Sequence, residues 1–149
     1  MTILFDTNVL CRLADRRHPV HEHAHSALRT LLQRRDPIVL VPQVLYEFWV
    51  ACTRPANQNG LGLTARQAHE KQRRAQSLAT LMHDTPLVFE EWQRLVVEHD
   101  AKGKSAHDAR LVAAMKVHGI EAILTFNVAD FARYPAIIVL DPAKVAATS

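Results

Sequence analysis

The segment that most constrains the fold of this chain is its beginning, where the apolar residues 3–5 are followed at once by Asp6. Thr7 and Asn8 add two more hydrogen-bonding side chains directly after the aspartate. In α/β folds the carboxyl ends of buried strands open into a crevice between loops, and ligand-binding groups gather there. The pattern therefore predicts a first buried strand whose end forms part of a ligand-binding edge, with Asp6 at that edge.

Length and composition are those of a folded protein with one core. The 149 residues are enough for a single domain, which we expect to span residues 1–149. Apolar residues make up 48% of the chain, and the longest apolar run is far below the roughly 20 residues needed to cross a bilayer. We find no signal-peptide pattern, and the only cysteines are Cys11 and Cys52. These features favour a reduced, cytoplasmic location without membrane association.

The charge balance mildly favours an anionic partner such as nucleic acid. The formal net charge is +3 at pH 7, with 18 Lys and Arg residues against 15 Asp and Glu residues. Each basic cluster is also compatible with a solvated helix face or a helix C-terminus, where cations complement the macrodipole. Charge therefore supports a nucleic-acid partner without establishing one.

Apolar periodicity and breaker residues predict alternating strands and helices. Strands are expected at 3–5, 38–41, 122–126 and 136–140, and helices at 20–35, 42–52, 64–83, 90–99 and 106–118. A short apolar run at 87–89 precedes the fourth helix, and residues 54–63 form a long irregular segment. Strands that alternate with helices pair in parallel and are covered on both faces. The predicted fold is an α/β three-layer sandwich with a mostly parallel central sheet.

Two helix boundaries carry specific signals. Thr64, with Gln67 three residues later, is typical of a capping box that starts a helix. Gly119 stands where a helix commonly ends in a left-handed residue.

Two further acidic residues stand among apolar neighbours at helical spacing. Glu47 has Val or Ala at i−3, i+3 and i+4, and Asp108 has Leu, Val and Met at i+3, i+4 and i+7. A carboxylate partly withdrawn from water is costly unless it is paired, hydrogen-bonded or bound to metal. Together with Asp6, the two acids indicate convergence on a cation. Each acid also has a structural explanation: Asp6 caps the following turn, Glu47 reaches solvent, and Asp108 forms a capping box with Ser105.

The chain resembles the PIN-domain nucleases, and within them the VapC-type ribonuclease toxins of type II toxin–antitoxin pairs. The matching motifs are F-D-T-N-V-L at 5–10, P-Q-V-L-Y-E-F at 42–48, S-A-H-D-A-R-L-V-A-A at 105–114 and L-T-F-N-V-A-D-F at 124–131. The loop at 59–63 is also similar to this group. The order and spacing of these motifs cover nearly the whole chain.

The resemblance implies a metal-dependent endoribonuclease that uses Mg²⁺ or Mn²⁺. Asp6, Glu47 and Asp108 correspond to the family's core acids, both as catalytic residues and as metal ligands. Asn127 occupies a place often held by aspartate, so either Asn127 as a ligand or Asp130 as a further catalytic acid completes the site. An oxygen-only, carboxylate-rich site suits Mg²⁺ or Mn²⁺ better than zinc.

Other site residues follow from their places beside these acids. Thr7, Asn8 and Thr125 are expected to orient the acids without contacting the metal themselves. Lys102 and Lys104, in a basic turn before Asp108, are expected to bind the RNA substrate.

The resemblance also implies a cognate antitoxin protein that covers the acidic crevice, and a homodimer formed through an exposed pair of apolar helices. Two alternatives remain open at this point: a stand-alone PIN-type RNA-processing nuclease, and a non-catalytic PIN-like domain that binds RNA or protein. The clustered carboxylates disfavour a pure binder, because they would repel phosphates unless a cation intervened.

The chain also contains three alternate histidines, a residue type that binds metals: His21, His23 and His25. His21 and His25 would share one helix face, which could capture zinc or nickel adventitiously. No third ligand is fixed nearby in the sequence, so this set is not expected to be functional.

Overall fold

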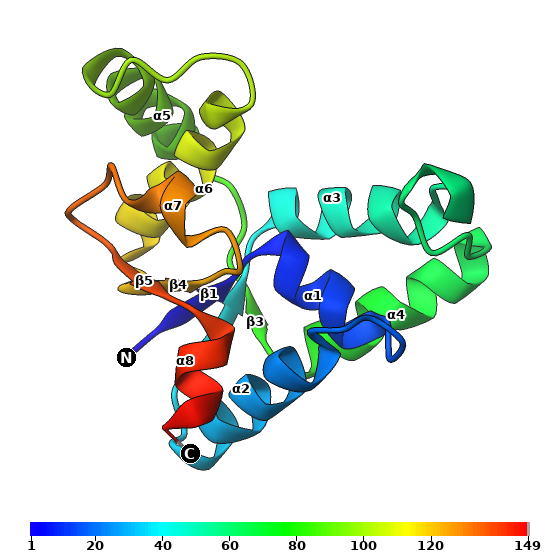
Figure 1. Ribbon diagram of the computed structural model, residues 1–149. Helices are drawn as coiled ribbons and strands as arrows, with labels where there is room; N and C mark the ends of the chain where they lie inside the picture. Colours follow the sequence, from blue (N-terminus) through cyan, green and yellow to red (C-terminus); the bar gives the residue numbers. More distant parts are fainter. Residues whose placement is uncertain (149) are drawn as a thin grey trace.

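A parallel sheet runs through the centre of the protein (Figure 1). The computed structural model describes residues 1–148, and within them the sheet has five strands. In spatial order these are β3 (Thr80–Leu81), β2 (Ile38–Leu40), β1 (Ile3–Phe5), β4 (Ala122–Leu124) and β5 (Ile138–Leu140). Leu4 pairs with Val39 on one side and Ile123 on the other, so the first strand is central. The predicted α/β class and the parallel sheet are confirmed.

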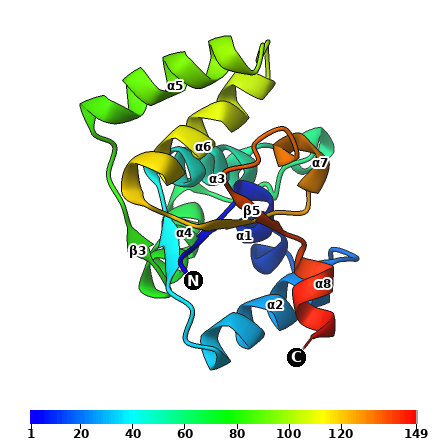
Figure 2. The same ribbon diagram turned by 90° about the vertical axis from the view of Figure 1, so that its left-hand side faces the viewer.

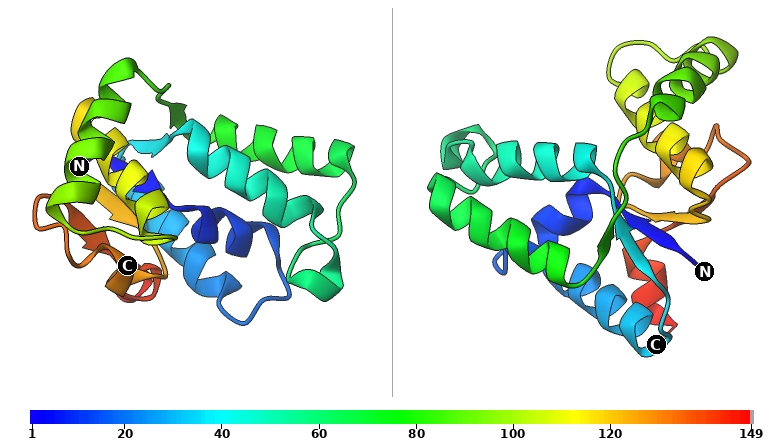
Figure 3. Two further views of the ribbon diagram at one scale, coloured as in Figure 1. Left: turned by 90° about the horizontal axis from the view of Figure 1, so that it is seen from above. Right: turned by 180° about the vertical axis from the view of Figure 1, so that it is seen from behind.

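Helices cover both faces of the sheet and complete the three layers. On one face lie α5 (Pro86–Glu98), α6 (Ser105–His118) and α7 (Val128–Phe131). On the other lie α1 (Thr7–Ala14), α2 (His21–Gln33) and α8 (Pro142–Ala147) (Figure 2). The helices α3 (Pro42–Thr53) and α4 (Ala65–Ser77) pack side by side and project beyond β2, with the one-turn 3₁₀ helix η1 (Ala56–Gln58) between them (Figure 3). Across the described part of the chain, every helix is too short or too polar to traverse a lipid bilayer.

The central strands are apolar and buried, as expected for strands covered on both faces. Every residue of β1, β2 and β4 is buried. Thr64 and Gln67 form the predicted capping box, in which each side chain accepts from the other residue's backbone N–H. Gly119 ends α6 with a φ of +69°. Both specific boundary predictions are therefore confirmed.

Two boundaries in the middle of the chain differ from the prediction. The helix expected to reach residue 83 ends at Ser77, and β3 follows it. This edge strand extends its pairing through Met82, whose N–H donates to the backbone of β2 at 2.8 Å. Two residues are too few to show strand periodicity in the sequence. The apolar run at 87–89 lies inside α5, because Pro86 already occupies the first turn of that helix.

The carboxyl ends of the three central strands meet at one edge of the sheet. Asp6 follows β1, Val41 follows β2 and Thr125 follows β4. The Asp6 N–H donates to the Leu124 carbonyl at 3.0 Å, so the backbone of Asp6 is still tied to β4. Because α1 and α3 begin directly after β1 and β2, their first side chains reach the same edge.

The irregular segment after α3 folds back against that helix. The Leu61 N–H donates to the Ala51 carbonyl at 3.1 Å. Asn59 turns the chain with a φ of +62°. Gly60 then passes so close to Arg54 that a Cβ at position 60 would lie 1.9 Å from the Arg54 carbonyl oxygen. Only glycine fits at this position without movement of the backbone.

We predict that Gly60→Ala lowers the free energy of unfolding by about 2–4 kcal/mol, because the backbone of Arg54 must move to admit the methyl group. Gly103→Ala is the matched control. Gly103 has a φ of +58° but no atom near its missing Cβ, so about 1–2 kcal/mol of left-handed strain is expected. Urea titration followed by circular dichroism measures both losses. Equal losses in the two variants would mean that the segment around Gly60 adjusts freely.

Candidate active site at the carboxyl edge of the sheet

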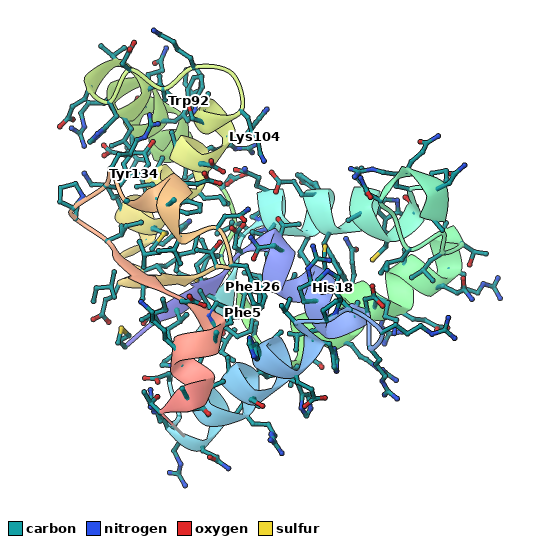
Figure 4. All side chains as sticks on the ribbon, in the orientation of Figure 1. Phe5, His18, Trp92, Lys104, Phe126 and Tyr134 are labelled. Atoms are coloured by element: carbon teal, nitrogen blue, oxygen red, sulfur yellow. The ribbon has the colours of Figure 1, made fainter. Side chains whose placement is uncertain are left out.

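A cleft of about 640 Å³ opens at the carboxyl edge of the sheet. Its walls come from α1 and the loop after it, from α3 and the segment after it, from the start of α6 and from the turn after β4. Lys104, before α6, and His18, after α1, both line it and lie well apart (Figure 4). The predicted site residues that line this cleft are Asp6, Thr7, Asn8, Glu47, Lys104, Asp108 and Asn127.

Asp6 is buried at the end of β1, with 7% of its surface exposed. Its Oδ1 accepts a 2.7 Å hydrogen bond from the Thr7 N–H, and its Oδ2 accepts a 2.8 Å bond from the Thr125 hydroxyl. The bond from Thr7 makes Asp6 the N-cap of α1, so the structural explanation of Asp6 is correct. Asn8 Nδ2 adds a longer bond to Oδ2 at 3.3 Å. These three bonds do not exhaust the lone pairs of the carboxylate, and Asp6 also lines the cleft.

Asn8 and Thr125 tie the start of α1 to the end of β4. Asn8 Nδ2 donates to Thr125 Oγ1 at 3.1 Å, and Asn8 Oδ1 accepts from the Phe126 N–H at 3.1 Å. Thr125 is fully buried; its hydroxyl donates to Asp6 and accepts from the Asn127 N–H at 3.0 Å. Through these bonds Asn8 holds Thr125, and Thr125 in turn holds the Asp6 carboxylate.

Glu47 is half-buried on α3, and both of its carboxylate oxygens accept hydrogen bonds. Thr7 Oγ1 donates to Oε2 at 2.7 Å, and Gln43 Nε2 donates to Oε1 at 3.0 Å. Thr7 therefore contacts Asp6 through its N–H and Glu47 through its hydroxyl. Gln43 was not among the predicted site residues. Its position one turn before Glu47 is the sequence signal that could have identified it.

Asp108 is partly buried in the first turn of α6. The capping box expected with Ser105 is wrong, because Ser105 Oγ bonds the N–H and the carbonyl of Lys102, each at 2.8 Å. Within residues 1–148, the Asp108 carboxylate accepts no hydrogen bond and forms no ion pair. Its polar atoms are therefore uncommitted at the edge of the cleft.

Burial and mutual repulsion raise the pKa values of two acids in the cleft. The pKa of Asp108 is raised to about 6, mainly by burial and then by the charges of Asp130 and Asp6, while the Lys104 ammonium acts in the opposite direction. Burial also raises the pKa of Asp6 and outweighs the two hydrogen bonds that lower it. A cation in the cleft would stabilise the ionised form of both groups.

The other predicted residues differ in their relation to these acids. Asn127 lines the cleft. Asp130 is exposed on α7 and does not line the cleft, but its charge raises the pKa of both buried acids. Lys104 lines the cleft, whereas Lys102 lies outside it and pairs with the exposed Asp100 at 3.1 Å.

The oxygen donors that line the cleft suit a divalent cation that keeps most of its water. Cys11 lines the cleft, but burial raises the pKa of its thiol to about 12, so it offers no thiolate near neutral pH. Within the described residues, no three His, Cys, Asp or Glu side chains are grouped so as to hold a metal ion. Mg²⁺ commonly keeps several waters and binds through one or two carboxylates. Asp6 with Glu47 or Asp108 therefore fits Mg²⁺, and no closed four-ligand zinc site is present in residues 1–148.

Two of the three histidines in the α2 run contact other groups of the protein. The rings of His21 and His25 stack with centroids 5.9 Å apart, and His21 Nδ1 lies 2.8 Å from the Arg12 carbonyl. Within residues 1–148, no group of three or more His, Cys, Asp or Glu side chains able to hold a metal ion includes these histidines.

Comparison with protein-family models matches residues 3–137 to the PIN domain. The chain belongs to the PIN-domain family. The match covers all the strands that end at the cleft and the four acids Asp6, Glu47, Asp108 and Asp130. The likeness to VapC-type proteins extends to solved structures of toxin–antitoxin systems.

Three of these structures are similar to the PIN domain described here over most of its length. VapBC2 from Rickettsia felis, bound to a promoter DNA fragment, has a TM-score of 0.71 at 19% identity and covers 95% of this chain and 98% of that one. VapC20 from Mycobacterium tuberculosis, a toxin that cleaves the sarcin-ricin loop, has a TM-score of 0.60 at 23% identity, with 81% and 86% covered. A toxin–antitoxin complex from Klebsiella pneumoniae has a TM-score of 0.62 at 25% identity, with 94% and 97% covered. Comparison with the sequences of curated proteins gives no match.

The raised pKa of Asp108 predicts a stability change with pH in the metal-free protein. The unfolded chain loses this proton near the ordinary pKa of 3.8, whereas the folded chain keeps it to about pH 6. Stability therefore falls as pH rises through this window, and the loss persists above it. Asp108→Asn removes the loss, so the Tm should rise by a few degrees at pH 7.5, corresponding to about 1 kcal/mol after discounting for solvent screening.

Differential scanning calorimetry in EDTA at pH 4 and pH 7.5 measures this effect. The exposed Asp100→Asn is the control and should change the Tm little at either pH. If Asp108→Asn and the wild type have the same Tm at pH 7.5, solvent already compensates the charge of Asp108 in the wild type.

Proposed function

We propose that this PIN-domain protein is a divalent-metal-dependent endoribonuclease and the toxin of a toxin–antitoxin pair. The observation that carries this proposal is the meeting of three acids in one cleft. Asp6, Glu47 and Asp108 come from positions far apart in the chain, and none forms an ion pair within residues 1–148. Acids without an ion-pair partner at the ligand-binding edge of a parallel sheet favour a bound cation over a structural role.

Mg²⁺ or Mn²⁺ would be held directly by Asp6 with Glu47 or Asp108, and the third acid would reach the ion through bound water. Asn127 would be a further oxygen donor and Asp130 an additional acid. When bound, the ion would supply a Lewis acid that activates water and offsets charge on the scissile phosphate. The chain's own part is to hold these oxygens in place before the substrate arrives. Thr7 and Thr125 fix Asp6, and Thr7 also fixes Glu47.

The rim of the cleft supports an RNA substrate. Arg12, Arg54 and Lys104 line the same cleft as the acids, so cations surround the site at which a phosphate would be cut. Lys102, in the turn beside it, would add a further exposed cation for the backbone of the RNA. Contacts of this kind position a nucleic acid without reading its bases. Choice of target would then depend on the shape of the walls, including the segment around Gly60.

The partners of this chain are proposed from its relatives. The Klebsiella pneumoniae and Rickettsia felis structures pair a toxin with an antitoxin, and we infer a cognate antitoxin protein that covers the acidic cleft. We also infer a homodimer in the cytoplasm. Exposed apolar side chains on α3 and α5 supply its surface: Tyr46, Val50, Leu87 and Phe89.

We predict that Asp6→Asn lowers RNA cleavage at least about 100-fold while the protein remains folded, because the variant keeps the size of the side chain and removes its charge. Purified protein is incubated with a mixed RNA pool in Mg²⁺, in Mn²⁺ and in EDTA. The control is Glu70→Gln, an exposed acid on α4 outside the cleft, which should cleave like the wild type.

Cleavage that survives both EDTA and Asp6→Asn would contradict the proposed function. A folded wild type that binds RNA without cutting it would instead favour the non-catalytic alternative. Cleavage without any antitoxin encoded beside the gene would favour the stand-alone RNA-processing nuclease.

A further inference from the structure

Gln43 is a buried polar residue at the junction of the two walls of the cleft. It stands in the first turn of α3, directly after Pro42, and 5% of its surface is exposed. Buried glutamine is uncommon, and its amide must find partners in the protein. The partners of Gln43 come from different helices.

The amide nitrogen of Gln43 makes two hydrogen bonds. Nε2 donates to Glu47 Oε1 at 3.0 Å and to the backbone carbonyl of His107 at 2.9 Å. Both partners can only accept, so the nitrogen and not the oxygen of the amide must face them. One bond ends on an acid of the cleft, and the other ends on the residue immediately before Asp108.

The bond to His107 joins two separately packed groups of helices. α3 packs against α1 and α4, whereas α6 packs against α5 and α7. The two groups lie apart in Figure 1, and each contributes residues to the lining of the cleft. Within residues 1–148, the Gln43 amide makes the hydrogen bond found between α3 and α6. It therefore links the helix that carries Glu47 directly to the helix that carries Asp108.

The Gln43 amide destabilises the fold if the side chain serves only to fill space. Gln43 Oε1 is buried and has no hydrogen-bond partner in the described residues. An unpaired buried acceptor is destabilising, and an apolar side chain of similar length would avoid that cost. A role in holding the acid explains why an amide occupies the position.

We propose that Gln43 is a positioning residue that fixes the Glu47 carboxylate relative to Asp108. With Thr7 on Oε2 and Gln43 on Oε1, both oxygens of Glu47 are held, so the carboxylate cannot turn about its last bond. Loss of the amide frees Oε1 and unties α6 from α3. The inference rests on the proposed function for its effect on catalysis, but the effect on Glu47 is independent of it.

The test compares Gln43→Met with Gln72→Met. Methionine has a similar length and no amide. Gln72 Nε2 donates to the Leu45 carbonyl at 2.7 Å, so this control removes an equivalent bond between α4 and α3 without touching an acid. Gln43→Asn, whose amide is one methylene shorter, is the second variant if methionine disturbs folding.

Three readouts separate positioning from support of the fold. Crystal structures of the metal-free variants should show Glu47 in more than one rotamer in Gln43→Met and in a single rotamer in Gln72→Met. Mn²⁺ titration followed by electron paramagnetic resonance should show about 10-fold or greater loss of affinity in Gln43→Met alone. In RNA cleavage, kcat should fall while KM for RNA stays unchanged, because the buried amide does not contact substrate.

An unmoved Glu47 in Gln43→Met would overturn the inference, whatever the protein's activity. Equal losses of Mn²⁺ affinity and kcat in the two methionine variants would also overturn it, since both would then report general stability. A wild type that neither binds Mn²⁺ nor cleaves RNA would refute the proposed function, and the position of Glu47 would still decide the role of Gln43.

Discussion

The burial of Asp6 at the end of the central strand is the constraint on which the rest of the site depends. A carboxylate with 7% exposure would be expelled from such a position without donors, and the structure supplies them from two directions. Thr7 donates from the start of α1 and Thr125 from the end of β4, so the acid fastens a helix to the sheet edge. The hydrogen bond that caps α1 is therefore also one that holds the Asp6 carboxylate at the cleft.

The remaining acids are held to different degrees, and this difference shapes the electrostatics of the cleft. Both oxygens of Glu47 are fixed by hydrogen bonds, whereas Asp108 has none within residues 1–148. Its pKa of about 6 is the result of burial beside like charges with a single opposing ammonium, that of Lys104. Such a cleft is poorly suited to an anionic polymer by itself and well suited to one that arrives with a divalent cation.

The sequence was sufficient to predict the parallel sheet and the meeting of Asp6, Glu47 and Asp108, because strand ends and apolar helix stripes are local patterns. It was insufficient wherever tertiary pairing decided the outcome. The strand β3 has two residues and exists through its bonds to β2, so no periodicity could reveal it. Gln43 was not predicted as a site residue for a related reason, because its hydrogen bond to His107 joins residues far apart in the sequence. Whether Asn127 or Asp130 completes the site also depends on three-dimensional reach, which places Asn127 in the cleft lining and Asp130 outside it.

The most direct test of the central claim, that these acids form a cation site, is anomalous diffraction from crystals grown with Mn²⁺. The predicted result is a manganese peak in the cleft, about 2.0–2.2 Å from an oxygen of Asp6 and shared with Glu47 or Asp108. The same crystals of Asp6→Asn should lack that peak. A cleft without manganese in the wild type, or a peak confined to His21 and His25 on α2, would contradict the claim.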